Sequence, residues 1–278
     1  MKVYYDPHLV EDAVFLEVCR REEAGDLDLY RKYHRLSDKI YETASPADRE
    51  EEFRRLHQSL FVKLGFEGVV RKVLEEFPGL DEVAILKAVA DFDEGADLRK
   101  GRGVIRLLPR RFLGIPGLKA YLRHELMHLT DMLSPDFGYI PEKTSPPVQV
   151  RYGLLWDIYI DSRLIGTGRE TISDKEGRRR EFDEVYRNLP EVERGAIFEA
   201  LWQRDRLTHK ELLDMAQGIR SGVPLPGSPC PLCRFPTHAW AEEIEEEVIE
   251  AIKSDLPSWD PGQGACDRCV EVYKVKGG

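Results

Sequence analysis

The sequence has no long hydrophobic run. Its longest apolar stretches are a handful of residues, well short of the roughly 20 that a helix needs to cross a bilayer. The first residues also lack the basic start, apolar stretch and small-residue cleavage site of a secretory signal. We therefore expect a cytoplasmic protein that does not enter a membrane.

An excess of positive charge is also missing. The 278 residues include 41 Lys and Arg against 51 Asp and Glu, which gives a formal net charge of -10. Overall charge therefore disfavours a nucleic-acid partner, although a total does not exclude a local basic patch. With 42% hydrophobic and 33% charged residues, the composition is that of an ordinary globular protein with enough chain for a large core.

Cysteine is scarce and unevenly placed. Four of the five cysteines form two close pairs, Cys230 with Cys233 and Cys266 with Cys269, and Cys19 stands alone. In a chain without a secretory signal, this spacing suggests metal ligation before disulfides.

The pattern of residues predicts an α+β, mostly helical fold with a small sheet. Residues 6–79 have helical periodicity with breaks near Gly25 and around Ser45-Pro46, which predicts three or four helices and a stop at Pro78-Gly79. Two β-rich runs, 83–89 and 103–108, predict a hairpin joined through residues 93–101. Further helices are expected over 118–133 and 148–165 and between 179 and 219, before a linker over 222–229. We expect an N-terminal helical region (1–80), a central domain (81–221) and a C-terminal cysteine module (222–278).

The helix predicted over 118–133 carries His124-Glu125-Leu126-Met127-His128. Two imidazoles at i and i+4 lie on one face, so both can bind a single Zn²⁺ while the intervening Glu reaches a metal-bound water. An apolar stripe on roughly the opposite side anchors the helix, and it consists of Leu118, Leu122, Leu126, Leu129 and Leu133. The alternative is a pair of histidines on an amphipathic helix that bind no metal.

This motif and the β-rich segment before it resemble the zincin metallopeptidases, in which a strand lining the cleft comes just before the HExxH helix. The resemblance covers about residues 83–164. It does not extend to the metzincin branch, whose signature continues with a Gly and a third His, because Asp131 and Ser134 occupy those positions. The resemblance implies a zincin-like core, a zinc-dependent peptidase, and a third zinc ligand from elsewhere in the chain.

The helix predicted over 148–165 contains Asp157 and Asp161, one turn apart within an apolar stripe. A carboxylate on a buried face is costly unless it is paired, hydrogen-bonded or bound to a metal. The two aspartates are therefore candidate metal ligands, and the alternative is that a buried Arg or Lys pairs with them.

The gluzincin-type zincins carry Glu-x-x-x-Asp on the corresponding helix, where the Glu binds zinc and the Asp supports a histidine ligand. Similarity to this pattern implies Asp157 as the third ligand, with Asp in place of Glu, and Asp161 as the supporting carboxylate. Some zincin-like relatives have a Trp-Asn-x-x-x-Asp helix, and that match makes Asp161 the ligand instead. We favour Asp157 and keep Asp161 as the alternative.

Catalysis at such a site needs a general base and an oxyanion stabiliser. Glu125 is the expected base, which takes a proton from the water and passes it to the leaving amine. Five residues are candidate stabilisers among which the sequence does not choose: Tyr139, Tyr152, Tyr159, Arg163 and His209.

The C-terminal cysteines suit a second zinc ion. Four thiolates form a closed tetrahedral site with no position for substrate, so Cys230, Cys233, Cys266 and Cys269 are expected to hold a structural zinc. A helix-like stretch over 238–253 lies between the pairs, and the module resembles a zinc ribbon or a treble-clef finger. The alternative is two redox pairs. Acidic residues over 242–247 argue against contact with phosphate and favour a protein partner or attachment of the tail to its own domain.

We therefore expect a zinc metallopeptidase with one catalytic and one structural zinc, acting on a peptide or protein. Two alternatives are an adaptor protein with a degenerate HExxH site and a zinc hydrolase of non-peptide substrates. Glu125 favours an enzyme over an adaptor, because a purely structural site has no use for a general base.

Overall fold

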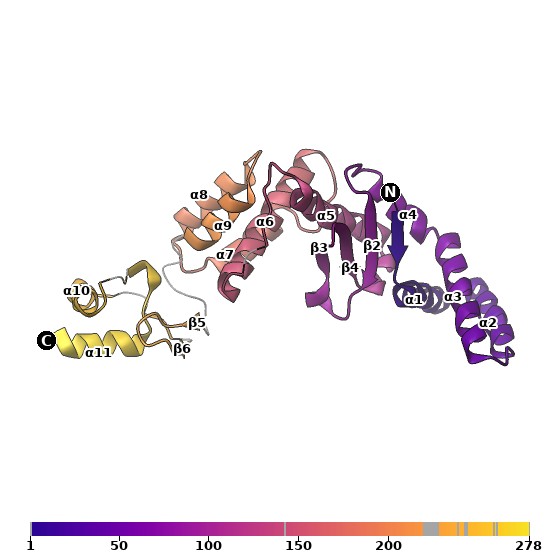
Figure 1. Ribbon diagram of the computed structural model, residues 1–278, viewed down its shortest axis with the longest axis horizontal. Helices are drawn as coiled ribbons and strands as arrows, with labels where there is room; N and C mark the ends of the chain where they lie inside the picture. The colour runs from indigo at the N-terminus through magenta and orange to yellow at the C-terminus, as the bar shows by residue number, and fades with distance from the viewer. Residues whose placement is uncertain are drawn as a thin grey trace. The chain divides into compact units, whose positions relative to one another are not determined.

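The computed structural model describes residues 2–141, 143–218, 228–237, 239–241, 244–257, 259 and 261–277. The fold is α+β and mostly helical with a small mixed sheet, as the sequence predicts (Figure 1). Residues 222–227 of the predicted linker, together with His238, Glu242 and Glu243, lie outside the described part. The chain divides into two compact units, Met1–Pro135 with Leu164–Ile172, and Asp136–Arg163 with Ser173–Gly278.

The first unit begins with one strand and four helices: β1 (Lys2–Tyr5), α1 (Pro7–Glu23), α2 (Leu27–Tyr41), α3 (Pro46–Lys63) and α4 (Phe66–Leu74). The predicted breaks near Gly25 and Ser45 are confirmed, because each falls between two of these helices. The predicted helix stop at Pro78-Gly79 is wrong, since α4 already ends at Leu74. The strand β1 is absent from the prediction.

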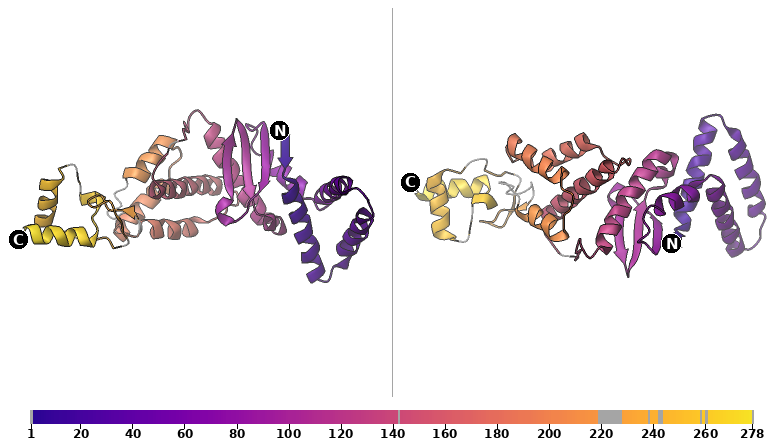
Figure 2. Two further views of the ribbon diagram at one scale, coloured as in Figure 1. Left: turned by 60° about the horizontal axis from the view of Figure 1, so that its bottom comes forward. Right: turned by 90° about the horizontal axis from the view of Figure 1, so that it is seen from above.

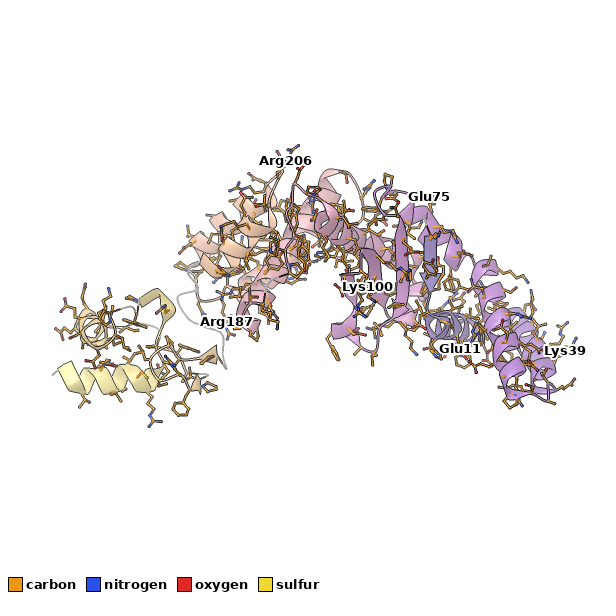
Figure 3. All side chains as sticks on the ribbon, viewed as in Figure 1. Glu11, Lys39, Glu75, Lys100, Arg187 and Arg206 are labelled. Carbon is orange, nitrogen blue, oxygen red and sulfur yellow. The ribbon has the colours of Figure 1, made fainter. Side chains whose placement is uncertain are left out.

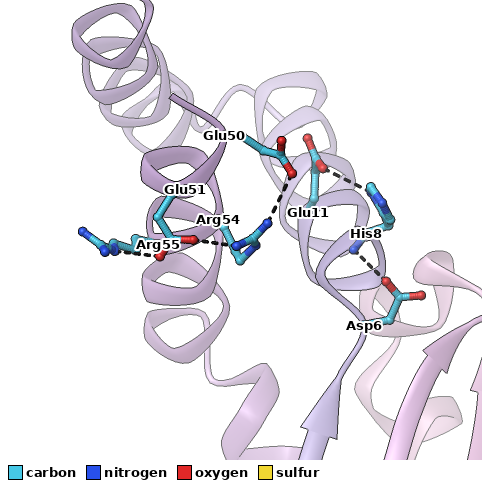
Figure 4. Close-up of polar contacts among 7 residues, drawn as sticks. All are labelled: Asp6, His8, Glu11, Glu50, Glu51, Arg54 and Arg55. Atoms are coloured by element: carbon cyan, nitrogen blue, oxygen red, sulfur yellow. Dashed lines mark hydrogen bonds and ion pairs between the residues drawn. The ribbon is translucent and has the colours of Figure 1, made fainter. Parts of the chain in front are cut away.

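Capping side chains mark the starts of α1 and α3. The Asp6 side chain accepts a hydrogen bond from the backbone N–H of His8 at 2.9 Å and another from Lys87 at 3.2 Å, so it caps α1 and ties it to the sheet (Figure 4). Ser45 caps α3 in the same way, as its sequence position predicts. On the exposed side of α3, Arg54 forms ion pairs one turn apart with Glu50 and Glu51 (Figure 4).

The sheet contains β2 (Glu82–Lys87), β3 (Gly95–Arg99) and β4 (Arg102–Leu107), and its strand order is β1-β2-β4-β3. β1, β2 and β4 are parallel, and β3 is antiparallel to β4. The prediction that the two β-rich runs form a hairpin is therefore wrong: these runs are the parallel neighbours β2 and β4. The hairpin is β3–β4, which turns at Lys100-Gly101, where both residues have positive φ.

One face of the sheet carries the core of this unit. The side chains of Val83, Ile85, Ile105 and Leu107 are fully buried there, together with apolar residues of α1, α4 and α5 (Ile115–Leu133). Figure 2 shows the sheet and these helices from two further directions. The helix predicted over 118–133 is confirmed, and Leu118, Leu122, Leu126 and Leu129 anchor it as expected, whereas Leu133 is exposed.

The remaining helices and strands are α6 (Pro146–Gly166), α7 (Lys175–Val185), α8 (Glu191–Trp202), α9 (His209–Gly218), β5 (Ser228–Pro229), β6 (Pro236–Thr237), α10 (Glu246–Asp255) and α11 (Asp267–Gly277). The helix predicted over 148–165 and those predicted between 179 and 219 are confirmed. The helix-like stretch predicted over 238–253 corresponds to α10, which begins only at Glu246. Among the described helices, none has the length and apolar character that a bilayer crossing requires.

Candidate metal centres

His124 and His128 lie on α5, whose leucines pack in the core against the sheet. The side chains of His124 and Glu125 are also buried. His128 is half-buried. The motif residues therefore lie in a place with little access to bulk water, where electrostatic interactions are strong.

The geometry of the two histidines suits one metal ion. Their Nε2 atoms lie 3.2 Å apart, and the ring centroids are 5.0 Å apart. Two imidazole nitrogens that bind a tetrahedral zinc at about 2.1 Å are about 3.4 Å from each other. The helix therefore presents the pair at a spacing close to that of two zinc ligands.

A carboxylate joins this pair. His124, His128 and Asp157 each offer one ligand atom, and these atoms all lie within 4.8 Å of one another. Asp157 belongs to α6, and about a third of its side chain is exposed. Among the described residues, Asp161 is not part of this donor set.

Asp161 instead faces a buried arginine. Its side chain is fully buried, and its Oδ2 accepts a hydrogen bond at 2.6 Å from Nε of Arg178 on α7. The Arg178 guanidinium also lies 3.5 Å from Oδ2 of Asp157 and 2.6 Å from Glu181. Burial alone lowers the pKa of Arg178, but the three carboxylates outweigh it and raise the pKa above its usual value. Asp161 therefore matches the alternative given for the two aspartates, in which a buried arginine pairs with the carboxylate.

A polar cluster that the sequence analysis missed lies next to Glu125 within the first unit. Arg111 donates two hydrogen bonds to Glu94, at 2.8 and 2.7 Å, and its guanidinium lies 4.0 Å above the ring centroid of Tyr121. Hydrogen bonding to Glu94 raises the pKa of Arg111, and Glu125 adds to that rise. Burial raises the pKa of Tyr121, again with a contribution from Glu125. The one sequence signal for this cluster is that Tyr121 lies four residues, or one helical turn, before Glu125.

The candidate oxyanion stabilisers are engaged in packing and hydrogen bonds. Tyr159 Oη accepts a hydrogen bond from the backbone N–H of Leu207 at 3.1 Å, and the guanidinium of Arg163 lies 4.0 Å from the Tyr159 ring centroid. The hydrogen bond from Leu207 ties α6 to the segment before α9, and the contact with Arg163 lies within α6.

The other three candidates gather around Trp156. Tyr152 Oη lies 2.7 Å from Nδ1 of His209, and the rings of Tyr139 and His209 meet edge to face. Both tyrosine rings also pack against Trp156. The structure therefore places three candidates in one cluster and the other two in a separate pair, and it selects none of them as the stabiliser.

The four paired cysteines converge at the C-terminal end of the chain. Their Sγ atoms all lie within 4.8 Å of one another, and two contacts that link the pairs, Cys230 to Cys269 and Cys233 to Cys266, are 3.9 Å long. Thiolates at about 2.3 Å from a tetrahedral zinc are about 3.8 Å apart. All five cysteines are free thiols, so the two pairs are not disulfides.

The polypeptide around Cys230 favours a thiolate. Its burial raises the pKa, but backbone N–H groups of Cys233, Cys266 and Leu232 point at the sulfur and bring the pKa down to about 7. Burial and the neighbouring sulfurs raise the pKa of Cys269. Cys230 is therefore the thiol of this group that ionises most easily. Four neighbouring thiolates would repel one another, so all four ionise together only around a bound cation.

A small core supports the cysteine group. Val248 and Ile252 of α10 pack with Val270 of α11, and the indole of Trp259 donates a hydrogen bond to the carbonyl of Gly264 at 3.1 Å. Trp240 forms a bridge to Cys266 and packs against the sulfurs. A core this small is of the kind that a bound metal ion commonly stabilises.

Comparison of the chain with models of protein families gave no match, and neither curated protein sequences nor solved structures matched it.

Proposed function

We propose that the protein is a zinc-dependent hydrolase of peptide bonds, with His124, His128 and Asp157 as zinc ligands and Glu125 as general base. The observation that carries this proposal is the gathering of the three ligand atoms within 4.8 Å around a helix whose buried Glu125 lies between the histidines in sequence. Two imidazoles and one carboxylate leave a fourth position for water, as catalytic zinc sites require.

The role of Glu125 follows from its place on α5. His124, His128 and Asp157 would hold a zinc ion that, when bound, would supply a Lewis acid for the attacking water and the scissile carbonyl. Glu125 would accept a proton from the attacking water and deliver it to the leaving amine. Arg111, held in place by Glu94, lies close enough to Glu125 for that carboxylate to contribute to the raised pKa of the guanidinium.

The sheet supports a peptide as substrate. β3 pairs with β4 alone among the described strands, so its other edge has backbone N–H and C=O groups with no strand beside them. An extended peptide can add to such an edge through main-chain hydrogen bonds. β3 also packs against α5, the helix that carries Glu125. This arrangement favours peptides over small esters or amides, which cannot extend along a strand.

The cysteine group has a different role. We assign it a structural zinc, because four buried or half-buried sulfurs leave no ligand position for a substrate. Its contribution is to fold the C-terminal segment, which then contacts a protein partner or attaches to the rest of its own chain.

The test compares wild type with Glu125→Gln and with a matched control, Glu170→Gln, which makes the same change outside the site. A fluorescence-quenched peptide library serves as the substrate, with a p-nitrophenyl ester as the non-peptide comparison. We expect Glu125→Gln to keep its zinc and fold while peptide cleavage falls by roughly 10²-fold or more, and the control to be unaffected.

Each alternative gives a different result. Cleavage of the ester but not the library supports a non-peptide hydrolase. Zinc at the histidines with no hydrolysis of either probe supports an adaptor. Full activity in Glu125→Gln contradicts the assignment of the general base.

A further inference from the structure

The opposite edge of the sheet carries features that the proposed hydrolase does not use. β1 is the outer strand there and pairs with β2 alone among the described strands. The backbone N–H groups of Lys2 and Asp6 donate to the carbonyls of Asp81 and Ile85, at 2.8 and 2.9 Å. Peptide groups alternate in direction along a strand, so Val3 and Tyr5 direct their N–H and C=O groups to the free edge.

Hollows follow this edge. One of about 370 Å³ is lined by Lys2, Val3, Tyr4 and Arg71, and one of about 120 Å³ by Val3, Arg71, Leu74 and Glu75. Val3 lines both, and the other residues come from β1 and α4. Hollows bounded in part by α4 therefore lie beside Val3, whose backbone faces the free edge.

A larger hollow continues round to the outer face of the sheet. It measures about 820 Å³, and its lining includes Lys2, Ala84, Lys100, Arg102 and Val104. Lys2 belongs to both this hollow and the edge hollow, so the two adjoin. Figure 3 shows Lys100 at the hairpin end of the sheet.

The lining of these hollows is basic. Five basic side chains contribute to them, against three acidic ones: Lys2, Arg71, Arg99, Lys100 and Arg102 against Glu75, Asp81 and Glu82. Three of the basic side chains are already in ion pairs: Arg71 with Glu67 at 2.7 Å, Arg99 with Asp97 at 3.3 Å and Arg102 with Glu82 at 2.6 Å. Among the described residues, Lys2 and Lys100 have no ion-pair partner, and they supply the uncompensated positive charge. This positive patch lies in a chain with a net charge of -10, so it is not a consequence of composition.

We propose that the free edge of β1 binds an extended acidic segment of a partner protein as an added strand. Val3 and Tyr5 supply main-chain hydrogen bonds, as in other cases of strand addition. Side chains of the added strand alternate between the hollow beside α4 and the outer face. Acidic side chains of the added strand that point to the outer face lie near Lys2 and the other basic residues of the larger hollow. This site is independent of the metal centres and of the proposed hydrolysis.

The position of Val3 allows a direct test. Because its N–H faces away from β2, Val3→Pro removes a donor from the free edge without removing a bond of the sheet. Val3→Thr keeps the N–H and a β-branched side chain and is the matched control. Lys2→Glu reverses the charge at the edge, and Lys39→Glu makes the same change on α2, away from it (Figure 3).

The probe is a labelled peptide in which Glu and Val alternate, with the Lys-Val version as its counterpart, and binding is followed by fluorescence anisotropy on the full chain. We expect wild type and Val3→Thr to bind the acidic peptide, and Val3→Pro and Lys2→Glu to bind it roughly tenfold more weakly or worse. Lys39→Glu keeps wild-type affinity, and thermal unfolding of all variants stays near that of wild type. Binding by wild type weakens as salt rises.

Several results would overturn the proposal. They are an absence of binding by wild type at about 1 mM peptide, equal binding of the Lys-Val peptide, and unchanged affinity in Val3→Pro. A wild-type dimer in light scattering that Val3→Pro disperses makes the occupant a second copy. An oligo-dT probe whose binding is lost in Lys2→Glu but kept in Val3→Pro makes it nucleic acid.

Discussion

Asp161 and Arg178 form a buried ion pair, with 2.6 Å between Oδ2 and Nε and side-chain exposures of 0% and 5%. The pair accounts for a carboxylate that the sequence marks as costly to bury. The two aspartates of α6 differ: Asp161 accepts a hydrogen bond from Arg178, whereas Asp157 lies 3.5 Å from the same guanidinium and also belongs to the donor group of the two histidines.

We predict that Asp161→Ala lowers the free energy of unfolding by about 3 kcal/mol, because it leaves the Arg178 guanidinium buried with less compensating charge. The double variant Asp161→Leu/Arg178→Met should be more stable than Asp161→Ala, since it removes both charges. Urea unfolding of the three proteins measures the difference. Equal stability of Asp161→Ala and wild type would show that the pair contributes nothing.

Local patterns in the sequence predicted most helices and, apart from Asp161, the two groups of residues that could hold a metal ion, because caps, periodicity and ligand spacing act over a few residues. The sheet was predicted poorly. β1 has only four residues, and β3 contains Gly95 and Asp97 in place of a run of β-branched residues. The parallel pairing of β2 with β4 depends on the packing of helices that are distant in sequence, so no local sequence pattern predicts it.

The arginines around the candidate site were harder to predict than the residues that could hold a metal ion. Arg178 and Arg111 act through contacts with Asp161 and Glu94, far from the motifs in sequence. Nothing in their immediate neighbours distinguishes them from surface arginines. Only the fold brings them to a carboxylate.

We predict a pH-dependent contribution from Glu94. Burial raises its pKa, but hydrogen bonds from Arg111 and the Leu108 N–H outweigh this and leave it below the usual value of 4.5. The stabilisation is therefore present above about pH 4.5 and is lost as the pH falls through the lower folded-state pKa. Glu94→Gln should cost about 2 kcal/mol at neutral pH. Urea unfolding should show a smaller difference from wild type at acidic pH, and a constant difference would contradict this assignment.

Two glycines should respond to alanine in opposite ways. A Cβ at Gly103 would lie 2.8 Å from Cδ1 of the buried Leu129, so Gly103→Ala forces a rearrangement under α5 and should destabilise by about 1 to 3 kcal/mol. Gly68 is exposed on α4, and a Cβ added there would meet no neighbouring atom within 4 Å. Gly68→Ala should therefore raise the free energy of unfolding by about 0.5 to 1 kcal/mol. Thermal unfolding compares them, and a shift of the same sign in both would refute the packing account.

The cysteine group should be needed for the fold of the C-terminal segment. Cys230→Ser or Cys269→Ser removes a ligand, so each should lose one zinc per chain and become sensitive to protease beyond residue 228. Cys19→Ser is the control, because Cys19 lies outside the group. Two metals and unchanged protease resistance in the ligand variants would rule out the structural zinc.

Metal content in a chain that lacks the cysteine site tests the central claim most directly. We predict that Cys230→Ser/Cys269→Ser retains one zinc per chain, and that adding His128→Ala or Asp157→Ala reduces this to none at modest chelator concentrations. Adding Asp161→Ala should leave the zinc in place. A background chain without zinc, or one that loses zinc with Asp161→Ala and keeps it with Asp157→Ala, would contradict the proposed site.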